Sequence, residues 1–231
     1  MPTTFIFSWR LANESVQMND TQRIANALDL AVLKPDASSS DVFDAAHAVE
    51  KYNLASICVA PCNVKYARFI TKRVCAVIGF PHGNTLSEIK RFEVHRAIDF
   101  GACELDVVVN YGRFLEGNSE VIKPELQGIV RDAHAVGVKV KAILETCYYT
   151  PEQIQEMCQL CVAAGVDWVK TSTGFGPGGA TPEAIKIMVE TVAGQVQVKA
   201  SGGIKTHADA LMYLDLGCTR LGVGLYKELI L

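Results

Sequence analysis

Short runs rich in Val, Ile and Cys recur along the chain, and each is followed by a segment with the periodicity of an amphipathic helix. Such apolar runs, bounded by helical segments, are typical of buried strands. The predicted strands are 29–33, 56–60, 74–80, 103–110, 138–145, 167–173, 196–200 and 219–223. The predicted helices between them are 41–51, a short unit at 61–71, 87–100, 121–136, 151–164, 182–192 and 207–216.

Alternation of strand and helix predicts parallel strands joined by crossover helices. Eight units in 231 residues, without a composition break or a linker, indicate an α/β fold of the closed (β/α)8 TIM-barrel type. We expect one domain over residues 1–231, with an extra N-terminal helix around 21–28. The alternative is an open doubly wound sheet. No G-x-G-x-x-G opens the first strand-to-helix turn, and the number of units favours closure.

Several predicted strands carry charged residues, which a strand buried on both faces does not normally contain. Alternation of side chains places Lys199 on the barrel-facing side of its strand and Asp106 on one face of the 103–110 strand. Lys170 lies near the end of the 167–173 strand, and Lys141 and Glu145 share a face of the 138–145 strand. Active sites of such barrels lie at the carboxyl ends of the strands. Lys170, Lys199 and Asp106 are therefore expected to converge there.

Two neighbouring lysines suit one kind of chemistry. A lysine attacks a carbonyl only as the free amine, and both burial and a nearby ammonium favour that form. A carboxylate beside them can relay protons. From position alone either lysine is a possible nucleophile, and an ion-pair network filling the barrel centre is the structural alternative.

Glycine-rich segments follow three consecutive strands. They are the stretch 174–179, Gly202-Gly203 and Gly222-Val223-Gly224. Glycine lets backbone N–H groups approach an anion, and barrels often bind phosphate after strands seven and eight. We therefore expect phosphate contacts at this end of the barrel, although any single pair can be a tight turn. Lys205 and Arg220 either add charge there or lie on the surface.

Composition narrows the classes of partner. The chain is 49% hydrophobic and 20% charged with a net charge of −3, so we expect no nucleic-acid or membrane partner. No signal peptide or membrane span is evident, and eight scattered cysteines suit reduced thiols in a cytoplasmic protein. Cys158-x-x-Cys161 is the one metal-like or redox-like spacing, but it lies in a helical segment without a second Cys/His pair at zinc-finger distance, so no metal is expected. Cys58 either faces the substrate or is a buried hydrophobe.

Residues 169–181 resemble the Schiff-base segment of deoxyribose-phosphate aldolases, and 198–204 resemble their second-lysine segment. Segments 33–36, 77–83 and 104–110 are also similar, in the same order. The resemblance implies a metal-independent aldolase that reversibly cleaves 2-deoxy-D-ribose 5-phosphate to D-glyceraldehyde 3-phosphate and acetaldehyde in deoxyribonucleoside catabolism. It implies small sugar phosphates and aldehydes as ligands, no cofactor, and a homodimer or homotetramer.

The resemblance also implies residue roles. Lys170 would form the imine, Lys199 would be the cation that keeps Lys170 reactive, and Asp106 would relay protons with water. Substrate or phosphate contacts are expected from Gly174, Gly202, Gly203, Gly222, Asp29 and Cys58.

The chain departs from the family pattern in two regions. Segment 29–33 lacks the His and Thr that the family commonly has there, and 222–225 lacks the serines that help hold phosphate. The tyrosine-ended tail that some members use at the active site is also not found, and Tyr226 is not a convincing substitute. An aldolase for an unphosphorylated or different sugar, and a catalytically silent sugar-phosphate-binding barrel, therefore remain as alternatives.

Overall fold

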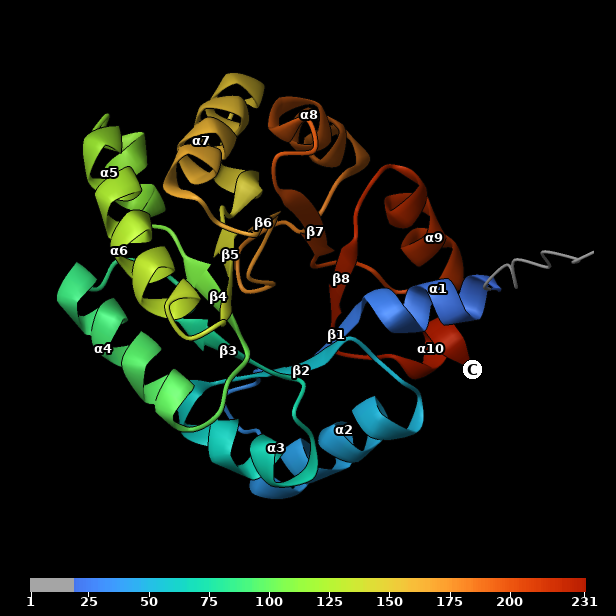
Figure 1. Ribbon diagram of the computed structural model, residues 1–231. Helices are drawn as coiled ribbons and strands as arrows, with labels where there is room; N and C mark the ends of the chain where they lie inside the picture. The colour runs from blue at the N-terminus through green and yellow to red at the C-terminus, as the bar shows by residue number, and fades with distance from the viewer. Residues whose placement is uncertain (1–18) are drawn as a thin grey trace, which may run out of the picture.

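Eight parallel strands form a closed barrel in the computed structural model, which describes residues 19–231. The strands follow chain order, β8 pairs with β1, and the helices surround them (Figure 1). They are β1 (Leu28–Val32), β2 (Ser56–Val59), β3 (Val74–Ile78), β4 (Glu104–Val108), β5 (Lys139–Ile143), β6 (Trp168–Lys170), β7 (Gln197–Ser201) and β8 (Arg220–Val223). The predicted barrel is confirmed, and the open sheet is excluded.

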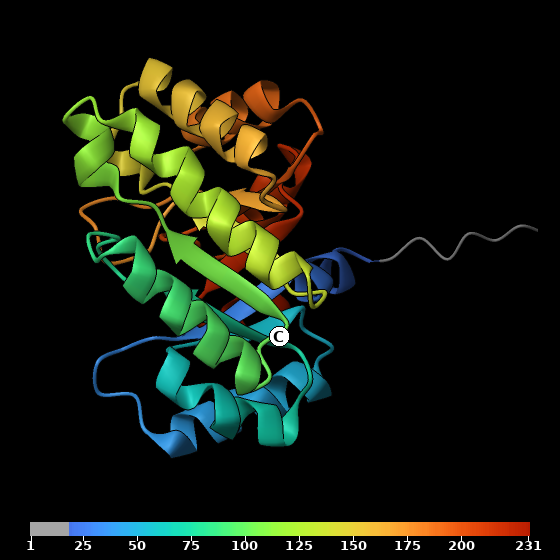
Figure 2. The same cartoon turned by 60° about the vertical axis from the view of Figure 1, so that its left-hand side comes forward.

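Helices lie outside the strands in both views of the barrel (Figures 1 and 2). They are α1 (Asp20–Ala27), α2 (Ser39–Lys51), α3 (Val64–Ile70), α4 (Ser87–Asp99), α5 (Tyr111–Leu115), α6 (Ile122–His134), α7 (Pro151–Ala164), α8 (Pro182–Val192), α9 (His207–Asp215) and α10 (Lys227–Ile230). Short 3₁₀ turns are η1 (Pro61–Asn63), η2 (Ser119–Val121) and η3 (Thr146–Tyr148). The extra N-terminal helix is confirmed as α1, whereas the short α5 and α10 were not predicted. Residues 1–18 of the predicted domain lie outside the described residues.

Local sequence signals set the helix ends. Thr150 and Thr181 cap α7 and α8, each with a proline in the first turn, and their hydroxyls accept hydrogen bonds from the backbone N–H of Gln153 and Ala184. Proline suits this position because its missing N–H has no partner in a first turn. Gly165 ends α7 with φ 83°, the left-handed conformation that favours glycine.

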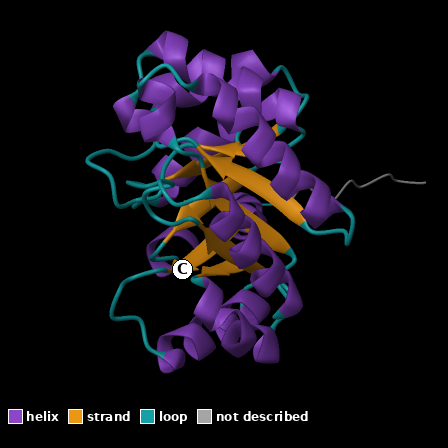
Figure 3. Ribbon diagram, turned by 90° about the vertical axis from the view of Figure 1, so that its left-hand side faces the viewer, coloured by secondary structure: helices purple, strands orange, loops and turns teal. Residues whose placement is uncertain are grey.

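The strands β1 to β6 end one to three residues before the predicted carboxyl ends, and β4, β5 and β6 show why. β4 stops at Val108 because Asn110 caps α5, where its side chain accepts a hydrogen bond from the Arg113 N–H. β5 stops at Ile143, before Glu145 turns into a left-handed conformation with φ 61°. β6 stops at Lys170, where the glycine-rich loop begins. Residues read as strand from their apolar pattern therefore belong to the loops at one end of the barrel (Figure 3).

The apolar core fills the layer between strands and helices. Leu105 and Val107 of β4, and Val140 and Ala142 of β5, are fully buried in this layer. Residues of the opposite parity point into the barrel, so that Asp106 pairs in register with Lys141 of β5. The barrel interior is thus built from charged side chains inside an apolar shell.

Candidate active site

Lys170 and Lys199 lie side by side inside the barrel, paired in register on β6 and β7. Their Nζ atoms donate to the same oxygen, Oδ2 of Asp106, at 2.7 and 2.8 Å. All three side chains are buried, with Lys170 3% exposed. The structure thus brings together the three residues that the strand alternation predicted to converge.

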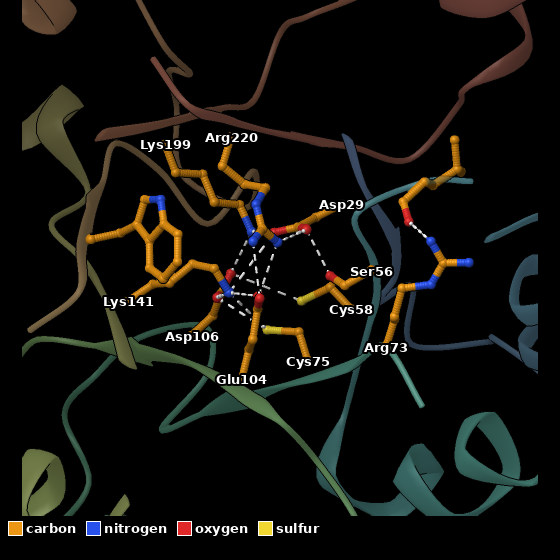
Figure 4. A network of polar contacts seen from close by, with 12 residues as sticks. Asp29, Ser56, Cys58, Arg73, Cys75, Glu104, Asp106, Lys141, Lys199 and Arg220 are labelled. Atoms are coloured by element: carbon orange, nitrogen blue, oxygen red, sulfur yellow. Dashed lines mark hydrogen bonds and ion pairs between the residues drawn. The ribbon is translucent and has the colours of Figure 1, made fainter. Parts of the chain in front are cut away.

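A second layer of charges lies against Asp106 and Lys199 of this trio (Figure 4). Asp29 accepts from Lys199 at 2.5 Å and from Arg220 and Ser56 at 2.6 Å. Lys141 is 3.0 Å from Asp106 Oδ1 and also binds Glu104.

Arg220 closes the network by a 2.9 Å contact with Glu104. The Trp168 ring lies beside this layer, 5.1 Å from the Arg220 guanidinium carbon and 5.5 Å from Lys141 Nζ. Every carboxylate of the network therefore has basic partners, as buried charges require.

Mutual pairing fixes several protonation states. Burial alone would raise the pKa of Asp106, but the ammonium groups of Lys141, Lys170 and Lys199 outweigh it and hold the pKa well below its usual range. Burial lowers the pKa of Lys199, but the carboxylates of Asp106 and Asp29 overcome this and raise it above the ordinary value. Asp106 is thus a carboxylate and Lys199 an ammonium at neutral pH.

A cavity of about 230 Å³ opens above the trio at the carboxyl ends of the strands. Its wall includes Lys170 and Lys199. The other predicted contact residues also line it, namely Asp29, Cys58, Gly174, Gly202, Gly203 and Gly222. A neighbouring groove of about 750 Å³ shares Thr173 and Gly174 with this cavity. The structure therefore gathers all the predicted contact residues around one pocket.

The glycines of the β6–α8 loop divide into two kinds. Gly174 has φ 87°, and a Cβ there would meet no atom within 4 Å. A Cβ on Gly179 would lie 2.3 Å from the Gly202 carbonyl oxygen, and one on Gly178 would lie 2.9 Å from the Cys147 Cβ. The later glycines therefore allow close packing of neighbouring loops, and Gly174 borders the cavity.

Glu145, which follows β5, anchors this loop. Its buried carboxylate accepts from the Thr173 N–H at 3.1 Å and also from the Thr173 hydroxyl. The Thr173 hydroxyl oxygen in turn accepts from the Phe175 N–H at 3.0 Å. One carboxylate thereby fixes the residues that begin the cavity wall after Lys170.

Comparison with known proteins identifies the family. The model of the DeoC/LacD family aldolases matches residues 23–216. The chain belongs to this aldolase family. It is 41% identical to the deoxyribose-phosphate aldolase of Treponema denticola over 201 residues, which cover 85% of this chain and 93% of the relative. It is likewise 41% identical to the enzyme of that name from Thermococcus gammatolerans over 207 residues, 87% of this chain and 92% of the relative.

Solved structures of aldolases have the same barrel. An aldolase called QR15 matches with a TM-score of 0.84 and 35% identity, covering 87% of this chain and 91% of its own. The tetrameric deoxyribose phosphate aldolase of Aeropyrum pernix matches with a TM-score of 0.85 and 28% identity, covering 91% and 90%. The chain is therefore an enzyme of the aldolase type, a carbon–carbon lyase.

The aldolase barrel also holds residues that the sequence interpretation did not place. Arg220, considered for phosphate binding or the surface, lies in the interior network with Asp29 and Glu104, so that interpretation was wrong. Lys205 is exposed, and its backbone N–H donates to the carboxylate of Asp209, which forms the capping box of α9 with the N-cap residue Thr206. Among residues 19–231, no helix has the length and apolar character needed to cross a membrane.

Proposed function

We propose that this aldolase reversibly cleaves 2-deoxy-D-ribose 5-phosphate to D-glyceraldehyde 3-phosphate and acetaldehyde, through an imine on Lys170. The observation that supports it most is the unequal pairing of the two lysines. Lys199 is held by two carboxylates, whereas within residues 19–231 the Lys170 ammonium pairs with the carboxylate of Asp106 alone, and Lys170 lines the cavity. Lys170 therefore loses fewer ion pairs than Lys199 would when its ammonium group gives up a proton.

The charge count of the network supports an uncharged lysine in this interior. Within the described interior, four basic side chains meet three carboxylates, namely Lys141, Lys170, Lys199 and Arg220 against Asp29, Glu104 and Asp106. Neutralising one lysine therefore leaves equal numbers of opposite charges in a medium where excess charge is costly. An uncharged Lys170 has the lone pair that attack on a carbonyl requires.

The reaction then follows from these positions. The Lys170 amine adds to the C1 carbonyl of the open-chain sugar, and the carbinolamine takes up a proton and loses water to give the protonated imine. The C3 hydroxyl gives its proton to Asp106 as the C2–C3 bond breaks, and the electron pair moves into the imine. Glyceraldehyde 3-phosphate leaves, the enamine carbon regains a proton, and water releases acetaldehyde from Lys170. Lys199 keeps its positive charge beside these steps.

The phosphate would lie where the loops after β6, β7 and β8 meet. Gly202 and Gly203 have φ values of 83° and 82° and line the cavity, so their backbone can approach an anion closely. Val223 and Gly224 line the same wall without a hydroxyl. That wall is the specific observation favouring the second candidate, an aldolase for an unphosphorylated sugar.

Steady-state kinetics separate the candidates. We expect kcat/KM for 2-deoxyribose 5-phosphate to exceed that for 2-deoxyribose, and Lys170→Met to abolish turnover of both. A higher value for the unphosphorylated sugar would support the second candidate. Binding of the phosphate ester without turnover by the unmodified protein would instead indicate a silent barrel.

Assembly and location belong to the same proposal. A homodimer or homotetramer is supported by the tetrameric relative from Aeropyrum pernix. A role in cytoplasmic deoxyribonucleoside catabolism follows from the proposed substrate. Light scattering after size-exclusion chromatography tests the assembly, and a monomer would contradict it.

A further inference from the structure

Two thiols meet beneath the cavity, beside the carboxylate of Asp106. Cys58 of β2 and Cys75 of β3 pair in register, and their side chains are 1% and 0% exposed. The two Sγ atoms and an Asp106 oxygen lie within 4.8 Å of one another. Figure 4 shows both sulfur atoms directed toward Asp106, with Cys75 Sγ donating to Oδ1 at 3.1 Å. The proposed mechanism gives neither thiol a role.

The surroundings of this pair disfavour a metal ion. Asp106 already accepts from Lys170 and Lys199 and contacts Lys141 at 3.0 Å. A divalent cation on the sulfurs would stand beside these ammonium groups and compete with them for the carboxylate. The same arrangement suits a covalent bond between the sulfurs. Neighbouring strands lie about 4.8 Å apart, within the roughly 4.4–6.8 Å between Cα atoms that disulfides span.

We propose that Cys58 and Cys75 form a disulfide when the protein meets hydrogen peroxide, and that this bond reversibly switches the aldolase off. The effect on activity rests on the proposed function, whereas the bond itself does not. The two residues would thus form an oxidation site inside the barrel.

The two thiols differ in pKa and in access to the cavity, as the attacking and the second thiol of such a reaction should. The side-chain contact with Cys75 lowers the pKa of Cys58, and the ammonium groups of Lys199 and Lys170 act in the same direction, against burial and the Asp106 carboxylate. Burial raises the pKa of Cys75 well above its usual range. Cys58 also lines the cavity. Cys58 is therefore the thiol that a small peroxide reaches, and the one of the two that loses its proton more readily.

The chemistry balances with peroxide as the oxidant. After Cys58 loses its proton to solvent, its sulfur attacks one peroxide oxygen, the O–O bond breaks, and the departing hydroxide takes up a proton to form water. The Cys75 sulfur then attacks the sulfenic sulfur of Cys58. The S–O bond breaks, and the hydroxide leaves as water with the Cys75 proton. The thiols lose two electrons and the peroxide gains them.

The bond would disturb the catalytic carboxylate. Cys75 donates its S–H to Asp106 and accepts from Lys141 at 3.5 Å. In the disulfide that donor is gone, and the sulfurs are drawn to about 2.05 Å from each other. Asp106 then loses one of the groups that orient it toward Lys170 and Lys199. We expect loss of most aldolase activity, with recovery on reduction.

The experiment uses the full chain with the exposed thiols removed, Cys62→Ser and Cys147→Ser. After peroxide treatment and blocking of free thiols, non-reducing tryptic digestion should give a cross-link between peptides 52–65 and 74–90. Activity, relative to untreated protein, should fall as the cross-link forms and return with dithiothreitol. Adding Cys75→Ser, or separately Cys58→Ser, should abolish both the cross-link and the dithiothreitol-reversible loss.

Three results would overturn the proposal. They are absence of the cross-link in the oxidised parent, a cross-link that leaves activity unchanged, and an equal reversible loss in the folded Cys75→Ser variant. Failure of the proposed function is seen separately, as absence of aldolase activity in the untreated parent, which still forms the cross-link. Circular dichroism establishes that each serine variant is folded, and the two variants serve as independent tests.

Discussion

Replacement of Lys199 by leucine tests the electrostatic pairing of the two lysines. The change removes the ammonium that contacts Asp29 at 2.5 Å and Asp106 at 2.8 Å, and it keeps an apolar side chain at a site 1% exposed. The carboxylates then have one basic partner fewer, and Lys170 becomes more necessary as their counter-ion. We therefore expect imine formation on Lys170 to require a higher pH.

The size of this effect follows from the shared acceptor. Two donors on one oxygen lie roughly 4–5 Å apart, and a unit charge at that distance contributes about 3–4 kcal/mol at an effective dielectric constant of about 20. One pH unit corresponds to about 1.4 kcal/mol, so the midpoint of imine formation should rise by about two to three units. The broken pair should also lower the free energy of unfolding by about 3–5 kcal/mol.

The assay is reductive trapping with acetaldehyde and cyanoborohydride at a series of pH values, with the modified fraction of Lys170 read by mass spectrometry. Lys139→Leu is the matched control, because Lys139 is 55% exposed and pairs with Asp167 at the surface. Its trapping midpoint should equal that of the parent. An unchanged midpoint in folded Lys199→Leu would refute the electrostatic reasoning.

Three further predictions concern the loops and the acid limit of stability. Glu145→Ala should raise KM and lower the free energy of unfolding by about 1–3 kcal/mol, because it leaves the Thr173 donors unpaired. Glu145→Gln keeps an acceptor oxygen, and its KM should lie between those of the parent and Glu145→Ala. Gly179→Ala, whose Cβ would lie 2.3 Å from the Gly202 carbonyl oxygen, should lower the free energy of unfolding in denaturant by about 1–3 kcal/mol. Gly128→Ala in α6 is the control, and equal stability of the two variants would contradict this prediction. The pKa of Asp106 in the folded protein lies well below its usual range. The stabilisation that its carboxylate gives to the folded state is therefore fully present above the unfolded pKa of about 3.9, and it is lost as pH falls through the folded pKa. Unfolding free energy measured from neutral to acid pH should fall in that range, and a flat profile would contradict the assignment.

Alternation along the strands carried most of the site prediction. Asp106 and Lys199 could be placed inside the barrel because their apolar neighbours had to face the helices. The same rule could also have placed Glu104 and Arg220 inside the barrel. Glu104 is two residues from Asp106 and Arg220 is two residues from Gly222, so each shares a strand face with a predicted site residue. Both lie at the first residue of a strand, where sequence alone does not show whether a side chain enters the barrel or lies at its rim.

Loop roles could not be derived in this way. The packing of Gly179 against the Gly202 carbonyl depends on how two loops approach in space, and nothing in the local sequence separates Gly179 from Gly174. Nor does strand parity distinguish Lys170 from Lys199. The numbers of carboxylates around each lysine supply that distinction, and they are known only once strand register brings Asp29 of β1 beside β7 and β8.

The most direct measurement of the central claim is the position of the trapped carbon. Incubation with acetaldehyde and borohydride should leave a reduced two-carbon adduct on Lys170, blocking tryptic cleavage there and yielding peptide 142–186. Lys170→Met should take up no adduct, and Lys199 should remain unmodified in the parent. An adduct on Lys199 instead, or none in the folded parent, would contradict the account.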